Sequence, residues 1–231
     1  MKPVGVGAAL GQRTWTEIAD NDPAPLLAVP IGSCEQHGPH LPMDTDTRIA
    51  LAAAAGLAAA RAGILIAPPL AITASGEHRG FPGTLSIGTA ALQTVLTELV
   101  RSADWAAGVI FINGHGGNLA AVEAAVLGLT HEGRRVISWW PRILDGDGHA
   151  GRTETSLMLA IDPASVRLTA AAPGNTEPLS ALMPRLSAEG VAALSANGVL
   201  GNPTGASVEE GNRLLAALTN DLIDRFDGWQ Q

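Results

Sequence analysis

Short apolar runs that end in turn residues alternate along this chain with longer segments of helical period, and this alternation constrains the fold most. The runs typical of buried strands are residues 25–33, 63–73, 108–118 (with its terminal loop) and 134–140. The helical segments are residues 47–62, 88–105, 118–133, 153–161 and 207–226. Strands separated by helices return in the same direction. We therefore expect a single-domain α/β/α sandwich of three layers with a mostly parallel sheet, covering residues 1–231.

Local signals refine this expectation. Pro68 and Pro69 interrupt the second run, so this strand is expected to be short or to lie at a sheet edge. Thr47 and Asn118 stand where they can cap the helices that follow them. No internal repeat or interdomain linker is visible in the sequence.

Charge and cysteine content exclude several classes of protein. The chain has 14 Lys and Arg against 22 Asp and Glu, a formal net charge of −8, which argues against nucleic acid or an anionic membrane as a partner. Its single cysteine, Cys34, suits a reducing compartment. The stretch Met1–Asp22 lacks a continuous apolar segment of the kind found in signal peptides. We therefore expect a soluble cytoplasmic protein.

One loop is dense in metal-binding chemistry. The segment "GSCEQHGPHLPMDTDT" follows the first predicted strand and includes Glu35, His37 and Asp46. Glu35 and His37 are two residues apart, so in extended backbone they lie on the same face and can hold one ion. Carboxylate and imidazole together suit Zn, Mn or Fe(II). A solvated acidic turn is the alternative for this segment taken alone.

Further polar clusters lie in other Gly-rich loops. His115, in "NGHGGN", follows the third strand, and in a parallel sheet the carboxyl ends of the strands form the ligand-binding edge. His149 and Glu154 lie in "GHAGRTETS", where Glu154 has the alternative role of a carboxylate at a helix N-terminus. His78 lies in "SGEHRGFPGT", as part of a substrate wall or of a plain turn.

The motifs "EQHGPHLPMDTDT", "EHRGFPGTLSIG", "NGHGGN" and "HAGRTETSLML", in this order, resemble the creatininase family of metal-dependent amidohydrolases. They span Glu35 to Leu159, so the resemblance covers most of the chain. It implies a three-layer α/β fold, a homo-oligomer and two divalent metal ions per subunit. "HAGRTETSLML" and the short, Ala-rich, Tyr-free chain are most similar to a branch of peptidases. Those enzymes cleave a modified precursor peptide near its C-terminus, which releases a small redox-cofactor precursor.

The resemblance also implies roles for individual residues. One ion would be held by Glu35 and His115 and the other by His37, with Asp46 bridging, while His149 would be catalytic. The creatinine-hydrolysing member has a carboxylate where this chain has Gly117, so Glu154 is the expected fifth ligand, with proton transfer as the alternative role. The same difference argues against creatinine as the substrate. From position alone, the residues expected to line the substrate pocket are His78, Trp139 and Trp140.

Two other functions are compatible with the same residues. The first is hydrolysis of a small cyclic amide or a formamide, because substrate choice resides in pocket walls that the motifs do not define. The second is a non-catalytic metal-binding assembly protein. The sequence does not choose among Zn, Mn and Fe(II), because imidazole and carboxylate accept all three.

Overall fold

The structure, a computed structural model, describes residues 8–143 and 146–231. Its sheet has the strand order β2-β1-β3-β4, and every pairing between these strands is parallel. The strands are β1 (Leu26–Ile31), β2 (Ile64–Ile66), β3 (Gly108–Asn113) and β4 (Val136–Trp139). The predicted α/β class with a parallel sheet is confirmed. The expectation about the N-terminal stretch falls partly on residues 1–7, which lie outside the described residues.

The register of the two central strands determines where the polar loops meet. β1 and β3 pair over their full lengths, from Leu26 opposite Gly108 to Ile31 opposite Asn113. Both strands therefore end at the same level, and the loops that follow them emerge side by side. β2 pairs with only the first three residues of β1 and lies at the edge, as its two prolines predict.

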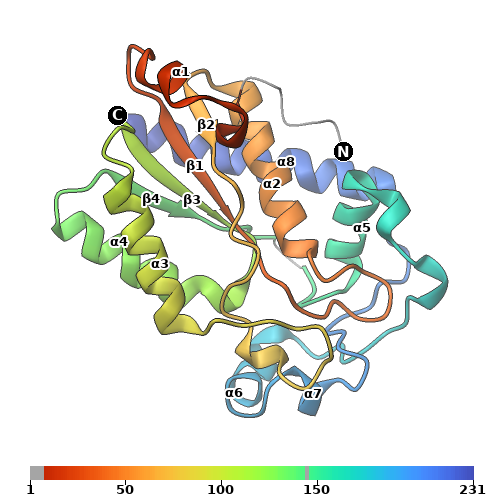
Figure 1. Ribbon diagram of the computed structural model, residues 1–231. Coiled ribbons are helices and arrows are strands. Elements are labelled where there is room, and N and C mark those ends of the chain that lie inside the picture. The colour runs from red at the N-terminus through yellow and green to blue at the C-terminus, as the bar shows by residue number, and fades with distance from the viewer. Residues whose placement is uncertain (1–7, 144–145) are drawn as a thin grey trace.

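Helices cover both faces of the sheet (Figure 1). Ala28 and Ile110 face one core, with α2 (Thr45–Ala60), α5 (Arg152–Ile161) and α8 (Val208–Gln230). Val29 and Phe111, their neighbours in sequence, face the other core, with α3 (Thr89–Ser102) and α4 (Leu119–His131). Because successive side chains of a strand point to opposite faces, a strand buried on both sides reads as a continuous apolar run.

Neither of the two predicted caps makes a side-chain capping bond, although Asn118 does occupy the N-cap position of α4. Thr47 lies inside α2, and its hydroxyl donates to the carbonyl oxygen of Ser33 at 3.2 Å. Asn118 precedes α4 without a side-chain capping bond, and its Nδ2 donates to the Gly32 carbonyl at 2.9 Å. Both side chains therefore tie the loop after β1 to neighbouring segments, because its buried carbonyls need donors.

A further layer of short elements lies beyond the carboxyl ends of the strands, where α6 (Leu179–Glu189) and α7 (Val191–Leu194) are seen in Figure 1. They pack through a small third core of Leu182, Val191 and Leu200. The remaining short elements are α1 (Trp15–Ala19), η1 (Leu10–Gln12), η2 (Gly76–His78), η3 (Gly116–Asn118), η4 (Pro163–Ser165) and η5 (Leu168–Ala170). Among the described residues, no helix has both the length and the apolar character needed to cross a membrane.

Candidate metal centre

The fold gathers the predicted ligand and catalytic residues beyond the carboxyl edge of the sheet. They come from the segment after β1, the start of α2, the η2 turn, the loop after β3 and the start of α5. Glu154 is partly exposed. The other six residues are buried: Glu35, His37, Asp46, His78, His115 and His149. Charged and polar groups buried this closely require partners or ions.

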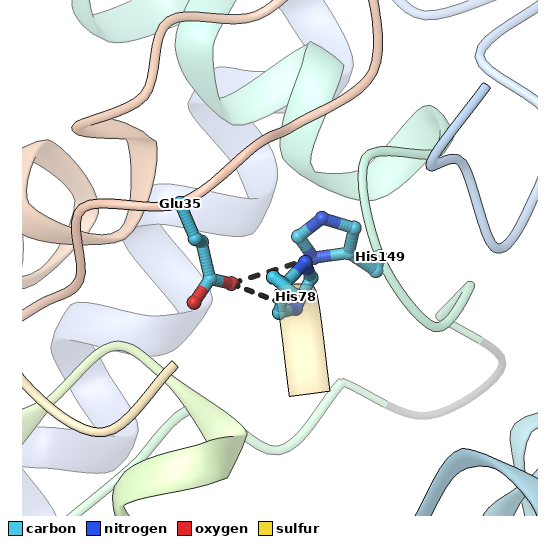
Figure 2. A group of neighbouring side chains, drawn as sticks. All are labelled: Glu35, His78 and His149. Atoms are coloured by element: carbon cyan, nitrogen blue, oxygen red, sulfur yellow. Dashed lines mark ion pairs between the residues drawn. The ribbon is translucent and has the colours of Figure 1, made fainter. Parts of the chain in front are cut away.

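Glu35 is the most unusual of them. It is fully buried, and neither carboxylate oxygen accepts a hydrogen bond within the described part of the chain. Its Oε1 lies 3.2 Å from Nε2 of His78 and 3.9 Å from Nδ1 of His149 (Figure 2), and its Oε2 lies 3.1 Å from Nε2 of His115. Burial raises the pKa of Glu35 to about 8. A cation at these oxygens would satisfy them, so the residues present fit a metal ion.

His37 presents one particular nitrogen to the centre. Its Nδ1 lies 3.1 Å from the carbonyl oxygen of Glu35, which can only accept, so Nδ1 carries the proton. Nε2 lies 3.1 Å from Oδ1 of Asp46, and it is the nitrogen that can bind an ion once the ion displaces its proton. Burial alone would lower the pKa of His37, but the Asp46 charge and hydrogen bond raise it to about 10.

His115 is oriented by the same logic. Its Nε2 donates to the carbonyl of Ala74 at 3.1 Å, and its Nδ1 lies 3.2 Å from Oδ2 of Asp46. Burial would raise the pKa of Asp46, but the positive charge on His37 and the bonds from both histidines hold it well below its ordinary value. Asp46 is therefore an anion between two imidazoles, the position of a bridging ligand.

His149 and Glu154 complete the cluster. An antiparallel bridge to Leu200 fixes the His149 backbone, and its Nε2 donates to the carbonyl of Gln36 at 2.8 Å. Burial, His37 and His78 hold the pKa of His149 well below its ordinary value. Glu154 accepts the backbone N–H of Ala150 at 2.6 Å. Its Oε2 lies 3.9 Å from Nε2 of His37, and burial raises its pKa to about 7.

Within the described residues, three groups of donor atoms are each compact enough to hold a metal ion. They are Glu35 with Asp46 and His115, His37 with His149 and Glu154, and Glu35 with His78 and His149. The donors are carboxylate oxygens and imidazole nitrogens, a set typical of Zn, Mn and Fe(II) sites.

Gln36 is a site residue that sequence reasoning missed. Its Nε2 lies 2.9 Å from Nδ1 of His78 and 3.1 Å from Nε2 of His149, and it donates to the Gly198 carbonyl at 3.0 Å. The side chain thus joins three loops. Its only signal was its place between two predicted ligands. His40, in the same loop, contacts the Thr155 hydroxyl, 2.9 Å from its Nε2.

A pocket of about 790 Å³ opens from the cluster. His78 and Trp140, two of the residues predicted to bind substrate, line it together with residues of α6. Trp139 differs from the expectation: it is 5% exposed, belongs to the core beneath the sheet and donates its Nε1 to Asp221 at 2.6 Å. Since neighbouring side chains of a strand point to opposite faces, only one of the two tryptophans can face the pocket.

A parallel sheet with buried carboxylates and imidazoles beyond its carboxyl edge defines an α/β enzyme with a candidate metal centre. The chain belongs to the creatininase family: the family described as creatinine amidohydrolase matches residues 11–226. It is therefore an enzyme of the amidohydrolase type.

Relatives and solved structures agree with this assignment. A mycofactocin precursor peptide peptidase from Mycolicibacterium smegmatis is 48% identical over 235 residues, which cover 99% of this chain and 92% of the relative. A solved structure described as "Creatininase Mn" has a TM-score of 0.77 and 27% identity, covering 94% of this chain and 96% of its own. A creatininase variant described as of "Zn-Zn type" has a TM-score of 0.77 and 26% identity over the same shares. Members of the family thus bind divalent metals.

Proposed function

We propose that this protein is a metal-dependent peptidase that cleaves the modified mycofactocin precursor peptide near its C-terminus and so releases the cofactor precursor. The observation that carries the proposal is the 48% identity, over 99% of this chain, to a relative named for that activity. The buried carboxylate–imidazole cluster supports it, because amide hydrolysis needs strong polarisation of the scissile carbonyl.

The proposed centre holds two divalent ions, Zn, Mn or Fe(II). Glu35 and His115 would hold one ion and His37 and Glu154 the other, with Asp46 as the ligand that both would share. The contacts of Asp46 with both histidines, at 3.1 and 3.2 Å, support the bridge. When bound, such ions polarise a carbonyl oxygen and lower the pKa of water.

His149 is the proposed proton carrier. With Nε2 donating to the Gln36 carbonyl, its Nδ1 is free of a proton and can accept one. The lowered pKa keeps this imidazole neutral at neutral pH, so it can take a proton from the attacking water. It then returns that proton to the leaving nitrogen. Glu154 has a raised pKa of about 7, which also suits proton transfer, as a second role beside metal binding.

The size and lining of the pocket favour a large substrate with apolar groups. Its volume of about 790 Å³ lies toward the upper end of ordinary ligand pockets. Part of the pocket wall is apolar, with Trp140, Leu179 and Met183 all exposed on it. Such a wall accommodates apolar peptide side chains, while His78 also lines the pocket and its Nε2 lies 3.2 Å from Oε1 of Glu35.

The test is mass spectrometry of the modified precursor peptide after incubation with the protein. Four samples are compared: protein as isolated, protein with chelator, chelated protein resupplied with Zn²⁺, Mn²⁺ or Fe²⁺, and peptide alone. We expect loss of a C-terminal fragment in the first and third samples only. An intact peptide with folded, metal-loaded protein would contradict the peptidase assignment and favour small cyclic amides or formamides as substrates.

A further inference from the structure

Gly117 lies against the metal centre at a position with no room for a side chain. A Cβ at this residue would lie 2.1 Å from Oε1 of Glu77, 2.5 Å from Nε2 of His115 and 2.6 Å from the carbonyl oxygen of Ala74. All three distances are far below van der Waals contact. The glycine therefore leaves the space that a carboxylate from the η2 turn occupies.

The η2 turn is held tightly to the loop after β3. Asn118 accepts the backbone N–H of Ala74 through its Oδ1 at 3.1 Å, and the Ala74 carbonyl accepts Nε2 of His115. On the opposite side, a Cβ at Gly190 would lie 2.7 Å from the Glu77 carbonyl oxygen, so the junction of α6 and α7 packs directly on this turn. The backbone of Glu77 is thus fixed from both sides, which lowers the entropy cost of aiming its side chain.

The carboxylate of Glu77 meets His115 on the edge turned away from Asp46. Its Oε1 lies 3.2 Å from Nε2 of His115, the nitrogen that carries the proton and that also lies 3.1 Å from Oε2 of Glu35. Its side chain is 25% exposed and lines the pocket. Glu77 belongs to none of the three compact groups of donor atoms found among the described residues. This geometry fits a carboxylate that acts on a ligand rather than on the ion.

We propose that Glu77 is a positioning residue of the metal centre, which helps to hold the proton of His115 on Nε2 and makes Nδ1, the nitrogen that faces Asp46, a stronger ligand for its ion. Gly117 is the residue that makes room for it. A carboxylate on the outer nitrogen of a ligating histidine fixes the ring and increases its basicity, and loss of such a partner weakens metal affinity by about 10–100-fold. This inference rests on the metal centre of the proposed function.

The test compares Glu77→Ala, Glu77→Gln and Glu189→Gln with the wild-type protein. Glu189 is the matched control, because its carboxylate also lies on the pocket wall but is paired with Arg185 at 3.1 Å. Each protein is stripped with a chelator and titrated with Zn²⁺ against a chromophoric chelator. Bound zinc is counted by elemental analysis, and the Tm of each metal-free form is recorded.

We expect Glu77→Ala to lower the affinity for one of the two zinc ions by about 10–100-fold. The affinity for the other ion should stay within about twofold of the wild-type value. Glu77→Gln should lower the affinity for the same ion severalfold, which is less than the loss in the alanine variant. The glutamine amide oxygen can still accept a hydrogen bond from Nε2 of His115, but it carries no negative charge. Glu189→Gln should match wild type. An effect on one ion alone distinguishes a positioning role from general destabilisation, which would lower the affinity for both ions.

Wild-type zinc affinity in Glu77→Ala would overturn the inference. An equal loss of affinity for both ions in a folded variant would overturn it as well. If the alanine variant does not fold, wild-type binding by Glu77→Gln overturns it equally. Either result, beside chelator-sensitive peptide cleavage by the wild type, leaves the proposed function standing. A wild-type protein that binds no zinc, manganese or iron would instead overturn the metal centre itself.

Discussion

Oδ1 of Asp46 lies 3.1 Å from Nε2 of His37, with both side chains almost completely buried. The other carboxylate oxygen faces His115 and also accepts the hydroxyl of Ser33 at 2.8 Å. Asp46 is the first acidic residue of α2, so the start of a rigid helix fixes its direction. Its anionic form is favoured both by the imidazoles and by the N-terminal end of the helix dipole.

Asp46→Asn should therefore disable the centre. Asparagine keeps the size of the side chain but cannot bridge two cations with two anionic oxygens. We expect bound metal to fall, and peptide hydrolysis to fall by at least the ~10–100-fold that loss of an orienting partner alone costs. Elemental analysis and peptide mass spectrometry measure the two effects.

Asp44→Asn is the matched control for this variant. Asp44 lies two residues earlier, 47% exposed, and its carboxylate is paired with Arg48 rather than with the cluster. The Asp44→Asn variant should retain its bound metal and its peptidase activity. Unchanged metal content and hydrolysis in Asp46→Asn would contradict the bridging role.

His149→Ala tests the assignment of the proton carrier. General acid–base catalysis is worth about 10²–10⁴-fold in rate, so we expect kcat to fall by that factor. Because Glu35, His37, Asp46 and His115 remain, both ions should still bind. The measurement is single-turnover peptide cleavage together with metal content. Loss of metal in step with activity would instead assign His149 as a ligand, a role that two of the three donor groups permit.

Removal of metal should destabilise the protein, and more so at higher pH. The pKa of Glu35 rises from an ordinary 4.5 to about 8 in the folded, metal-free chain. A carboxyl with a raised folded pKa favours folding while protonated, so this stability is present below about pH 4.5 and is lost as the pH rises towards 8. We expect the Tm of chelated protein to fall between about pH 4.5 and 8, and added Zn²⁺ to reverse the fall.

Glu35→Gln isolates this effect. The variant has no carboxyl at this position, so the Tm of its metal-free form should vary less over the same range than that of the wild type. Differential scanning calorimetry of both proteins checks the difference. Equal pH dependence in the two would show that ionisation of Glu35 is not the cause.

The fold and the ligand loops could be predicted from sequence because strong periodic signals define them. β1 and β3 are buried on both faces and read as unbroken apolar runs, and the parallel arrangement brings their carboxyl ends together. Glu35, His115 and His149 follow strands or precede helices in Gly-rich loops, so their meeting at one edge follows from topology.

Other features depend on contacts that local sequence does not carry. α6 contains Pro184 and follows a Pro- and Gly-rich stretch, so its helical period was masked, yet it forms the outer wall of the pocket. The roles of Trp139 and Trp140 depend on which face of β4 meets the core. The Glu77 carboxylate can lie beside His115 only because Gly117, forty residues further along the chain, has no side chain there.

The close packing of α8 on α5 gives a last prediction, on stability. Gly211 lies near the start of α8, where a Cβ would come within 1.8 Å of the Ser156 carbonyl oxygen and 2.9 Å of Cβ of Ala160. Gly228, near the other end of the same helix, has no such neighbour within 4 Å. Gly211→Ala should lower the free energy of unfolding by about 1–3 kcal/mol through overpacking. Gly228→Ala should raise it by up to about 1 kcal/mol, because alanine costs less entropy than glycine in a helix.

Urea denaturation of both variants and the wild type measures these opposite signs. Because Ser156 lies two residues after Glu154 on α5, a displaced α5 should also shift the Glu154 carboxylate. We therefore expect Gly211→Ala to reduce metal affinity as well, while Gly228→Ala leaves it at the wild-type value. A stabilised Gly211→Ala protein would mean that α8 can move away from α5 at no cost, contrary to the close packing of the two helices.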